Sequence, residues 1–364
     1  MDRREFLRTT GAAAAAAAAT TAASEAVAQP PAGVASNVAA PAVGRGLKEL
    51  RLAMSWPDAT SGPADQAHRL GQRIAALSEG RYRVAIAHGG SSGFAAVRAG
   101  EADLYFASEN DHLDAHRALA YFAGLPGNRG IAPRQLANWL LVGGGQALWD
   151  DLAAEFGVKA MLAGHTGGSI FRACARIDAM SELQGGKVSV PGLGHDVARG
   201  VGLVPVAVSA EELAGAMARG DLLAAEWGGA ITNLSLGLGK VAPFAVGASI
   251  NRNGSGLSLG MSRRLWERLS ASDQAMFESA AAAELQLSLA EEEAHRQFLA
   301  PTPNADTVWP IAEELDRAVR RVADAVVAHV AGSDSRAQRI NAGYAVFRQA
   351  ITPMETAPTA GATA

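Results

Sequence analysis

The sequence contains one cysteine, few aromatic residues and no excess of positive charge. Cys174, alone among 364 residues, can form neither an intramolecular disulfide nor a cysteine zinc cluster. A net charge of -4 supplies no basic field for a phosphate backbone, so we expect no nucleic-acid partner. Beyond the N-terminal region, no apolar run has the length of a transmembrane helix. What remains is a chain with 49% hydrophobic residues, long enough to build two α/β domains.

The N-terminal residues have the three parts of an export signal. Arg3 and Arg4 begin a run that resembles the twin-arginine motif, an alanine-rich core follows, and Ala26-Val27-Ala28 matches a cleavage site. That core is too weakly apolar to serve as a stable membrane anchor. We therefore predict a twin-arginine signal peptide over residues 1–28, a flexible leader over 29–46, export by the Tat machinery, and a soluble periplasmic mature protein.

From residue 47 the hydrophobic pattern switches between strand and helix periods. Residues 47–56, 82–88 and 103–108 have strand-like patterns, and residues 62–80 and 93–102 between them have helical spacing. This β-α-β-α-β order is typical of a doubly wound sheet. The first part of the mature chain is therefore predicted to be an α/β unit.

The same pattern recurs further along the chain. Strand-like runs occupy residues 158–163, 187–192, 204–209 and 221–227, and Ser209 opens a helix with a capping box. Two successive α/β halves predict two lobes with a cleft between them. Ligands bind such folds at the carboxyl ends of parallel strands.

The C-terminal third is helical and has no strand pattern. Residues 272–299 read as one long helix rich in Ala, Leu and Glu, which is suited to bracing two lobes. Further helices follow a Pro-rich break. The predicted boundaries are 47–158 with about 248–291 for the first lobe, 159–247 with about 292–351 for the second, and a disordered tail over 352–364.

Glu226 and Trp227 end a strand-like run in which they follow four apolar residues. A carboxylate at the end of a buried strand is costly unless it has a partner. No second carboxylate lies nearby in sequence to complete an acid and base pair, so catalysis has little support. The pair could be a structural core contact, could hydrogen-bond a small polar ligand, or could ligate a cation.

Two short motifs point to chemistry less specifically. Ser91 stands in a G-x-S-x-G match between a predicted strand and helix, where a hydrolase nucleophile would lie. In a chain with 40 glycines a Gly-rich turn is the simpler interpretation. Gly192-Leu193-Gly194 lacks the third glycine of a dinucleotide fingerprint, because Val197 stands there. We expect no resident cofactor.

The chain resembles a solute-binding protein of a tripartite ATP-independent periplasmic (TRAP) transporter, of the dicarboxylate-binding type. The resemblance covers nearly the whole mature chain and lies in the order and spacing of several short matches. They are Ser55-Trp56-Pro57, Ser78-Glu79-Gly80-Arg81, Gly143-Gly144-Gly145 with Leu148-Trp149, Gly164-His165-Thr166-Gly167, Pro191-Gly192-Leu193-Gly194, residues 217–229 and residues 262–284. This family implies an α/β, two-lobed periplasmic binding protein fold with a hinge and a long C-terminal bracing helix.

The resemblance also implies where a ligand would bind. The family clamps a carboxylate with an arginine, but Ser189 occupies that position here, and Ser169 stands at the family's glutamine. Arg172, on the neighbouring strand, is our candidate for a substitute clamp. In some members the Glu-Trp pair helps to hold a cation, which would fall on Glu226 and Trp227. The expected ligand-binding residues are Trp56, Ser169, Arg172, Ser189, Glu226 and Trp227.

The resulting prediction is a receptor and not an enzyme. It captures a small polar ligand in a cleft between the lobes and delivers it to the membrane permease of a TRAP transporter. Three alternatives stay open: a receptor of the ATP-driven type, an exported serine hydrolase using Ser91, and a diverged receptor domain used in sensing or scaffolding.

Overall fold

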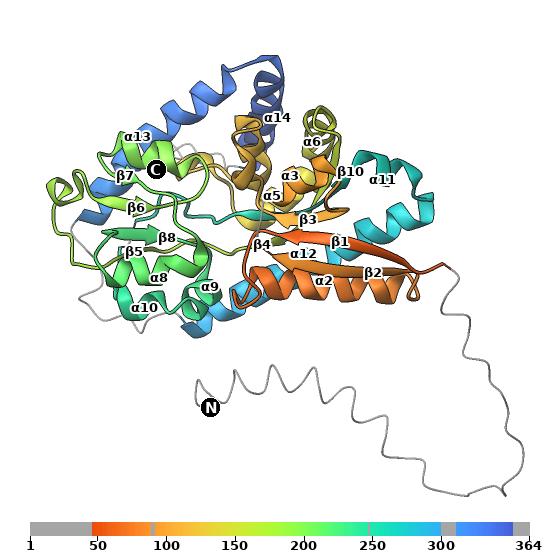
Figure 1. The fold of residues 1–364 in the computed structure, drawn as a ribbon. Coiled ribbons are helices and arrows are strands. Elements are labelled where there is room, and N and C mark those ends of the chain that lie inside the picture. The colour runs from red at the N-terminus through yellow and green to blue at the C-terminus, as the bar shows by residue number, and fades with distance from the viewer. Residues whose placement is uncertain (1–45, 89–91, 247, 300–310, 352–364) are drawn as a thin grey trace, which may run out of the picture. The chain divides into compact units, whose positions relative to one another are not determined.

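Two five-stranded sheets carry the fold of this chain (Figure 1). A computed structural model describes residues 46–88, 92–246, 248–299 and 311–351, and its contacts separate the chain into residues 1–46 and 47–364. The predicted signal peptide, nearly all of the predicted leader, Ser91 and the predicted tail over 352–364 lie outside the described residues. No helix in the described ranges combines the length and apolarity needed to cross a membrane.

The first sheet has the order β2-β1-β3-β10-β4, and the second has the order β7-β6-β8-β5-β9. In the first sheet β1 pairs in parallel with β2 and β3, whereas β10 runs antiparallel between β3 and β4. In the second sheet β6 pairs in parallel with β7 and β8, and β5 runs antiparallel to β8 and β9. The strands are β1 (Lys48–Met54), β2 (Tyr82–His88), β3 (Leu104–Ala107), β4 (Val158–His165), β5 (Phe171–Ala173), β6 (Lys187–Ser189), β7 (Val204–Pro205), β8 (Ala224–Glu226), β9 (Phe244–Ala245) and β10 (Gly256–Ser262).

Helices follow most strands and cover the sheets. The α-helices are α2 (Pro63–Leu77), α3 (Gly93–Ala99), α4 (Ala120–Ala123), α5 (Pro133–Leu141), α6 (Gly145–Ala154), α7 (Gly194–Gly200), α8 (Ala210–Ala218), α9 (Ala230–Ser235), α10 (Leu238–Val241), α11 (Arg263–Arg268), α12 (Ala271–Leu299), α13 (Ile311–Ala331) and α14 (Ser335–Ile351). Short 3-10 helices are η1 (Glu109–His112), η2 (Arg117–Leu119), η3 (Gly127–Arg129) and η4 (Met180–Leu183). The predicted capping box is confirmed at α8, where the Ser209 hydroxyl accepts a hydrogen bond from the Glu212 amide.

The strand alternation sends side chains of β3 to opposite faces of the first sheet. Leu104 and Phe106 enter the core with α2, α11 and α12, whereas Tyr105 and Ala107 enter the core with α3 to α6. Both faces of this sheet are therefore covered, as its apolar strands predict.

The division of the chain differs from the sequence-based boundaries in two places. The predicted second lobe begins at residue 159, but β4 belongs to the first sheet, where it pairs with β10. Helix α14, predicted in the second lobe, contributes Ala337, Ile340 and Tyr344 to a core of the first sheet. Periodicity could not reveal either assignment, because pairing partners are set by contacts between distant parts of the chain.

Strand β10 was not predicted at all, and its glycines explain why. Its residues alternate Gly, Leu and Ser, which weakens the pattern of a buried strand. In the fold, a Cβ at position 260 would overlap the ring of Tyr105 on the adjacent strand. Gly260 is therefore required by close packing between strands, which is a tertiary constraint.

The long predicted C-terminal helix is confirmed as α12, with 29 residues. It packs on β4 and α2 of the first half and also contacts α9 of the second half. Helix α13 joins the halves in a second place, since Ile311 and Leu315 pack on the second sheet's core while Val330 packs on the first. The fold is thus an α/β, two-lobed fold braced by long helices.

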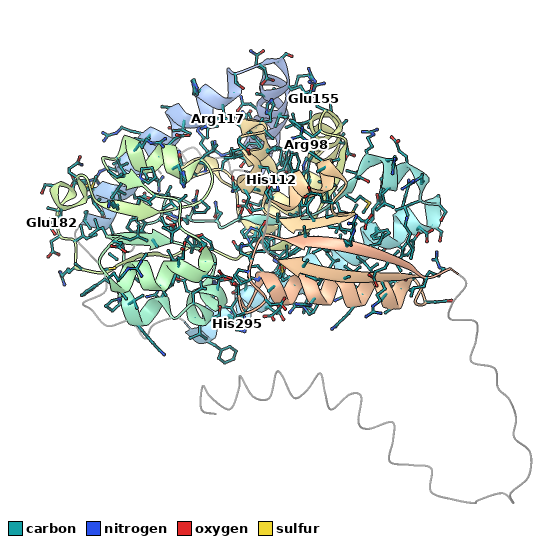
Figure 2. The ribbon with its side chains drawn as sticks, in the orientation of Figure 1. Arg98, His112, Arg117, Glu155, Glu182 and His295 are labelled. Carbon is teal, nitrogen blue, oxygen red and sulfur yellow. The ribbon has the colours of Figure 1, made fainter. Side chains whose placement is uncertain are left out.

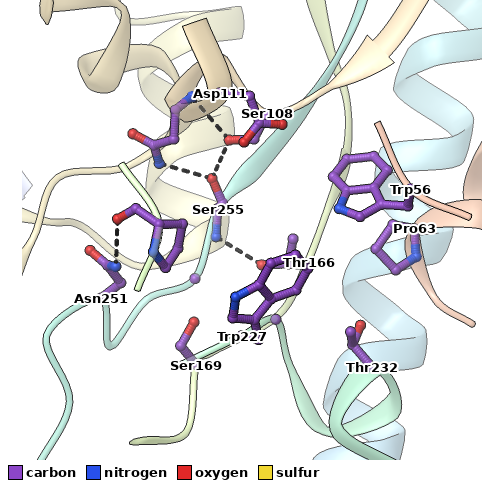
Figure 3. A pocket seen from close by; sticks show the side chains of 14 residues that line it. Trp56, Pro63, Ser108, Asp111, Thr166, Ser169, Trp227, Thr232, Asn251 and Ser255 are labelled. Carbon is purple, nitrogen blue, oxygen red and sulfur yellow. Dashed lines mark hydrogen bonds between the residues drawn. The ribbon is translucent and has the colours of Figure 1, made fainter. Parts of the chain in front are cut away.

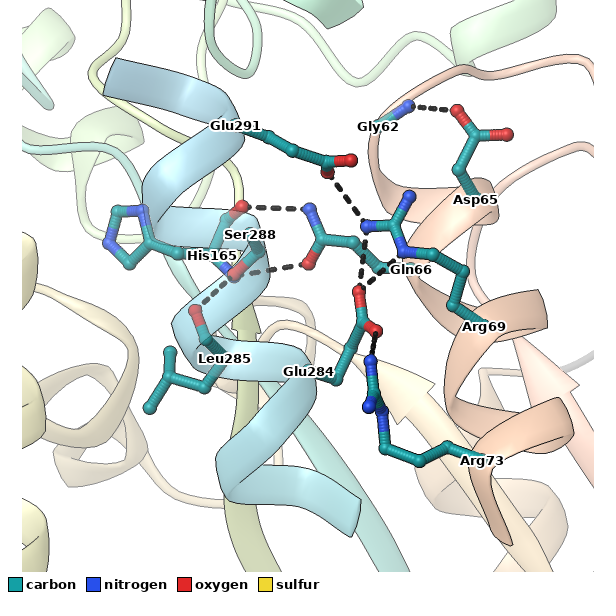
Figure 4. Close-up of polar contacts among 10 residues, drawn as sticks. All are labelled: Gly62, Asp65, Gln66, Arg69, Arg73, His165, Glu284, Leu285, Ser288 and Glu291. Atoms are coloured by element: carbon teal, nitrogen blue, oxygen red, sulfur yellow. Dashed lines mark hydrogen bonds and ion pairs between the residues drawn. The ribbon is translucent and has the colours of Figure 1, made fainter. Parts of the chain in front are cut away.

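A buried ion pair fixes α12 to α2 (Figure 4). Glu284 is fully buried, and one of its carboxylate oxygens accepts hydrogen bonds from Arg69 Nε at 3.0 Å and Nη2 at 2.7 Å. Arg73 approaches the other oxygen at 3.5 Å. Burial raises the pKa of Glu284, while Arg69 acts to lower it. The carboxylate therefore depends on Arg69 for most of its compensation.

We predict that Arg69→Met destabilises the protein by about 3 kcal/mol, because it leaves a buried carboxylate with Arg73 alone. The pKa of Glu284 is already raised in the folded state, and losing Arg69 raises it further. A carboxyl whose pKa is raised on folding lowers the free energy of unfolding as pH rises toward the folded pKa. The loss of stability in Arg69→Met relative to the parent should therefore be smaller at pH 5 than at pH 8.

Urea unfolding of Arg69→Met, of the Arg69→Met/Glu284→Met pair and of the exposed control Arg263→Met measures this. The double variant should recover most of the loss, and the control should stay within about 0.5 kcal/mol of the parent. A deficit in Arg69→Met no larger than that of the control would contradict a compensating role for Arg69.

A candidate solute site between the two sheets

Four loops that follow parallel strands meet at one cavity. Trp56 follows β1, Ser108 follows β3, Pro191 follows β6 and Trp227 follows β8. The carboxyl ends of parallel strands share one edge of their sheet, so each sheet offers two of these loops to the space between the sheets. The cavity is therefore built where a doubly wound fold places a ligand.

The cavity draws its wall from both halves and from the segments that connect them (Figure 3). Its volume is about 80 Å³, room for several groups the size of a water molecule. Its described lining residues are Trp56, Pro63, Ser108, Asn110, Asp111, Thr166, Ser169, Pro191, Trp227, Gly228, Thr232, Asn251, Gly254 and Ser255.

Hydrogen bonds between the connecting segments hold one side of the wall. The Ser255 amide donates to Thr166 Oγ1 at 2.9 Å, and the Ser255 and Ser108 hydroxyls lie 2.6 Å apart. Asn110 Nδ2 donates to Ser255 Oγ at 3.1 Å. These bonds tie the end of β3 to the segments that cross between the sheets (Figure 3).

Asp111 is the one ionisable side chain among the described residues that line the cavity. The residue is exposed there, yet the protein around it raises the pKa of its carboxyl to about 6 by desolvation. Hydrogen bonds from the Ser108 amide and the Ser55 side chain oppose that rise. The carboxyl is therefore mostly ionised at neutral pH.

The sequence predicted three of these wall residues: Trp56, Ser169 and Trp227 all line the cavity. Trp56 is nearly buried and meets the Phe106 ring edge-on at 6.1 Å. Trp227 donates its indole Nε1–H to Ser189 Oγ at 3.1 Å. Ser189, predicted to contact the ligand, lies buried behind Trp227 and fixes the ring in place.

Glu226, one of the expected ligand-binding residues, makes hydrogen bonds within the protein. It is fully buried, and its carboxylate accepts hydrogen bonds from Ser249 Oγ at 2.8 Å, the Ile250 amide at 2.8 Å and the Asn251 amide at 2.5 Å. Burial raises its pKa, and these three donors act to lower it. Glu226 thus fastens the segment leading from β9 to β10 onto the end of β8, one residue before Trp227.

This arrangement does not suit Glu226 as a cation ligand. Three donors already use three of the roughly four lone-pair sites on its two oxygens, and Ser169 offers only a neutral hydroxyl. Within the described ranges, no three His, Cys, Asp or Glu side chains gather closely enough to hold a metal ion.

Arg172 does not reach this cavity, so the expected substitute clamp lacks support. Strand alternation turns Phe171 and Ala173 into the core and Arg172 to the opposite face. Its Nε donates to Asn233 Oδ1 at 3.2 Å, and Nη1 donates to the Ala242 carbonyl at 3.3 Å. The guanidinium therefore supports α9 and the end of α10.

Several wall residues were missed by the sequence analysis, among them Asp111, Asn110 and Asn251. Asp111 and Asn110 sit in η1, a single 3-10 turn begun by the Ser108 N-cap. The end of a predicted parallel strand at Ser108 could have pointed to them. No local signal marks Asn251, because Glu226 brings it to the site from far along the chain.

The halves also touch at the rim of the cavity. Gly192 has a φ of 60°, and a Cβ there would lie 2.5 Å from Asn110 Oδ1. Arg117 of η2, labelled in Figure 2, pairs with Asp196 of α7, and Thr232 Oγ1 donates to the Ser61 carbonyl at 3.4 Å. The described arrangement is thus a closed one, with second-half residues seated against first-half loops.

Comparison with known proteins decides the family. Residues 56–331 match the model of bacterial extracellular solute-binding protein, family 7 (DctP). The chain belongs to this family. It is a periplasmic solute-binding protein that takes up small organic ligands and works with a TRAP membrane permease.

Individual relatives agree with this membership. The monocarboxylate 2-oxoacid-binding periplasmic protein all3028 of Nostoc sp. is 28% identical over 315 residues, covering 83% of this chain and 84% of the relative. A TRAP solute-binding protein from Bordetella bronchiseptica, solved with calcium and picolinate, has a TM-score of 0.75 at 22% identity, covering 84% and 92%. One from Chromohalobacter salexigens, solved with (S)-(+)-2-amino-1-propanol, has a TM-score of 0.69 at 16% identity, covering 84% and 95%.

We predict that Glu226→Gln lowers the free energy of unfolding by about 1–3 kcal/mol. The amide offers one acceptor oxygen to three donors and turns an NH2 group toward a backbone amide, which leaves buried donors unsatisfied. Glu267→Gln is the matched control, because Glu267 forms an exposed i,i+4 pair with Arg263.

Chemical denaturation of the two variants checks this prediction. An equal, near-zero effect in both would show that the Glu226 carboxylate is not what fastens residues 249–251.

Proposed function

We propose that the cavity between the two sheets is the solute site of this receptor, and that the protein binds its solute without transforming it. The observation that carries the proposal is the composition of the wall, to which both halves and the connecting segments all contribute. A solute seated there contacts both lobes at once. It therefore favours the closed arrangement by its extra contacts in that state.

Trp56 and Trp227 supply the main apolar surfaces of the proposed site, one from each half. Each indole offers a large rigid face with little conformational entropy to lose. Ser108, Asp111 and Ser169 add polar groups that orient the solute. Ser189 and Glu226 are positioning residues in this proposal, since they act through Trp227 and Asn251.

Family membership leaves the chemical class of the solute open. The relatives named above bind a 2-oxoacid, picolinate with calcium, and an amino alcohol. The carboxylate clamp implied by the resemblance is replaced by Ser189, and the donor set at Glu226 does not suit a bridging cation. We infer a small polar solute that needs neither.

A thermal-shift screen of organic acids, amides, polyols and amines on the mature chain tests the receptor function. For any compound that stabilises the protein, Trp227→Ala should weaken binding by about tenfold or more, because it removes one apolar surface and the anchor on Ser189. Trp266→Ala is the control, since Trp266 packs beside the first sheet's core away from the cavity. A stabilising compound whose affinity is unaffected by Trp227→Ala binds elsewhere and contradicts the proposed site.

Gly192→Val tests closure separately from contact. The new side chain would collide with Asn110, and the backbone at position 192 has a φ that favours glycine. The second half could then not pack against the first-half loop at this rim. We expect weaker binding with intact folding, measured by calorimetry and circular dichroism. The control Gly220→Val also has positive φ, but a Cβ there meets nothing within 4 Å. Equal affinities in the two variants would argue against closure at this rim.

A further inference from the structure

The charge and hydrogen bonding of the cavity wall restrict which chemical classes of solute can bind there. We infer that the solute is a small organic cation, an ammonium compound, held by the Asp111 carboxylate and by the indole faces of Trp56 and Trp227. This inference rests on the proposed solute site and names the class of molecule that fits it.

The first argument is charge. Asp111 is ionisable and reaches the cavity, and no Lys, Arg or His stands among the described residues of the wall. The nearest candidate for a positive charge from sequence, Arg172, is bound to Asn233 and Ala242 on another face. His165, at the end of β4, is buried, and desolvation lowers its pKa to about 3, so it stays neutral. An anionic solute would meet a carboxylate without a compensating cation, and a cationic solute would complete a pair.

The second argument is the balance of donors and acceptors. Four of the wall's side chains already donate hydrogen bonds within the protein. Asn110 Nδ2 donates to Ser255 Oγ, Asn251 Nδ2 to the Pro191 carbonyl, Thr166 Oγ1 to the Gly167 carbonyl and Thr232 Oγ1 to the Ser61 carbonyl.

Besides the Ser169 hydroxyl and the Trp56 indole N–H, the wall still offers acceptors. The Asp111 carboxylate has lone pairs beyond those used by the Ser108 amide and the Ser55 side chain, and it cannot donate when ionised. Asn110 Oδ1 is buried without a hydrogen-bond partner. A carboxylate solute needs several donors, whereas an ammonium group brings its own donors and needs acceptors.

The third argument is the aromatic surface. An ammonium group is attracted to the face of an indole, most strongly where water is excluded. The Trp227 Nε1–H is committed to Ser189, which holds the ring in one orientation. Trp56 is held by its edge-on contact with Phe106 and lines the same cavity (Figure 3). A carboxylate sitting on either ring would instead be repelled by the ring's negative face.

Calorimetry with two matched series tests the inference. The first compares 2-aminoethanol, ethylene glycol and glycolate, which are similar in size and differ in charge. The second compares choline with its neutral isostere 3,3-dimethyl-1-butanol. We expect at least one ammonium compound to bind about tenfold or more tightly than its neutral isostere, and glycolate not to bind.

Asp111→Asn should remove most of that preference, lowering affinity for the ammonium compound by about tenfold or more while changing affinity for the neutral isostere little. Asp114→Asn, an exposed change in the same region and outside the cavity wall, is the matched control. Thermal unfolding of both variants establishes that they are folded.

Three outcomes would overturn the inference. One is tight binding of glycolate or pyruvate, with or without added calcium, accompanied by no binding of ammonium compounds. Another is a charge preference that Asp111→Asn leaves intact. A third is the absence of any ammonium binding in both series. For any acid or ammonium compound that binds in these cases, loss of its binding in Trp227→Ala would still support the solute site, whereas binding unaffected by Trp227→Ala would remove the proposed site as well.

Discussion

The carboxylate of Glu226 is the interaction on which the rest of the site depends. It is buried at the end of β8 and binds three donors from residues 249–251, which lead from the second sheet back to the first. A buried carboxylate is stable only with such compensation, so the strand end and the crossing segment specify each other. The next residue is Trp227, and the fastened segment carries Asn251 to the same wall.

A second buried polar side chain also positions a residue of the cavity wall. Ser189 accepts a hydrogen bond from the Trp227 indole and so orients that ring. The replacement of a clamping arginine by serine therefore alters two things together. It removes a positive charge from the wall, and it gives Trp227 a fixed partner. A wall with Asp111 as its ionisable group and with fixed aromatic faces is suited to a solute unlike the carboxylates bound by some relatives.

Binding and closure are linked because the cavity is shared. Residues of the first half, the second half and the crossing segments each supply part of the wall, and no one of them encloses it alone. Gly192, with its positive φ and close approach to Asn110, permits the two rims to meet. The long helix α12 is fixed to α2 through Glu284 and Arg69 and also contacts α9 of the second half, so it links the two halves behind the cavity.

Local patterns were sufficient for much of the fold. Strand-like patterns marked β1 and β2, helical spacing marked α2, and a capping box marked the start of α8, because each of these signals arises from neighbours in sequence. Strand β10 was not predicted from sequence, because its glycines allow close packing against Tyr105 and weaken the local strand pattern. The placement of β4 in the first sheet and of α14 against a core of that sheet was also not predicted, because both depend on contacts between distant parts of the chain.

For the candidate site, the sequence by itself pointed to Trp56, Ser169 and Trp227, which line one cavity in the fold, since each follows or adjoins a strand end in a recognisable motif. It also determined that Ser189 leaves the wall without the clamping arginine. Only the tertiary structure decided that Arg172 points away from the cavity, that Glu226 accepts hydrogen bonds from residues 249–251, and that Asp111 reaches the cavity. The physical reason is that a side chain's partner, and hence the charge left for a ligand, depends on contacts between residues far apart in the chain.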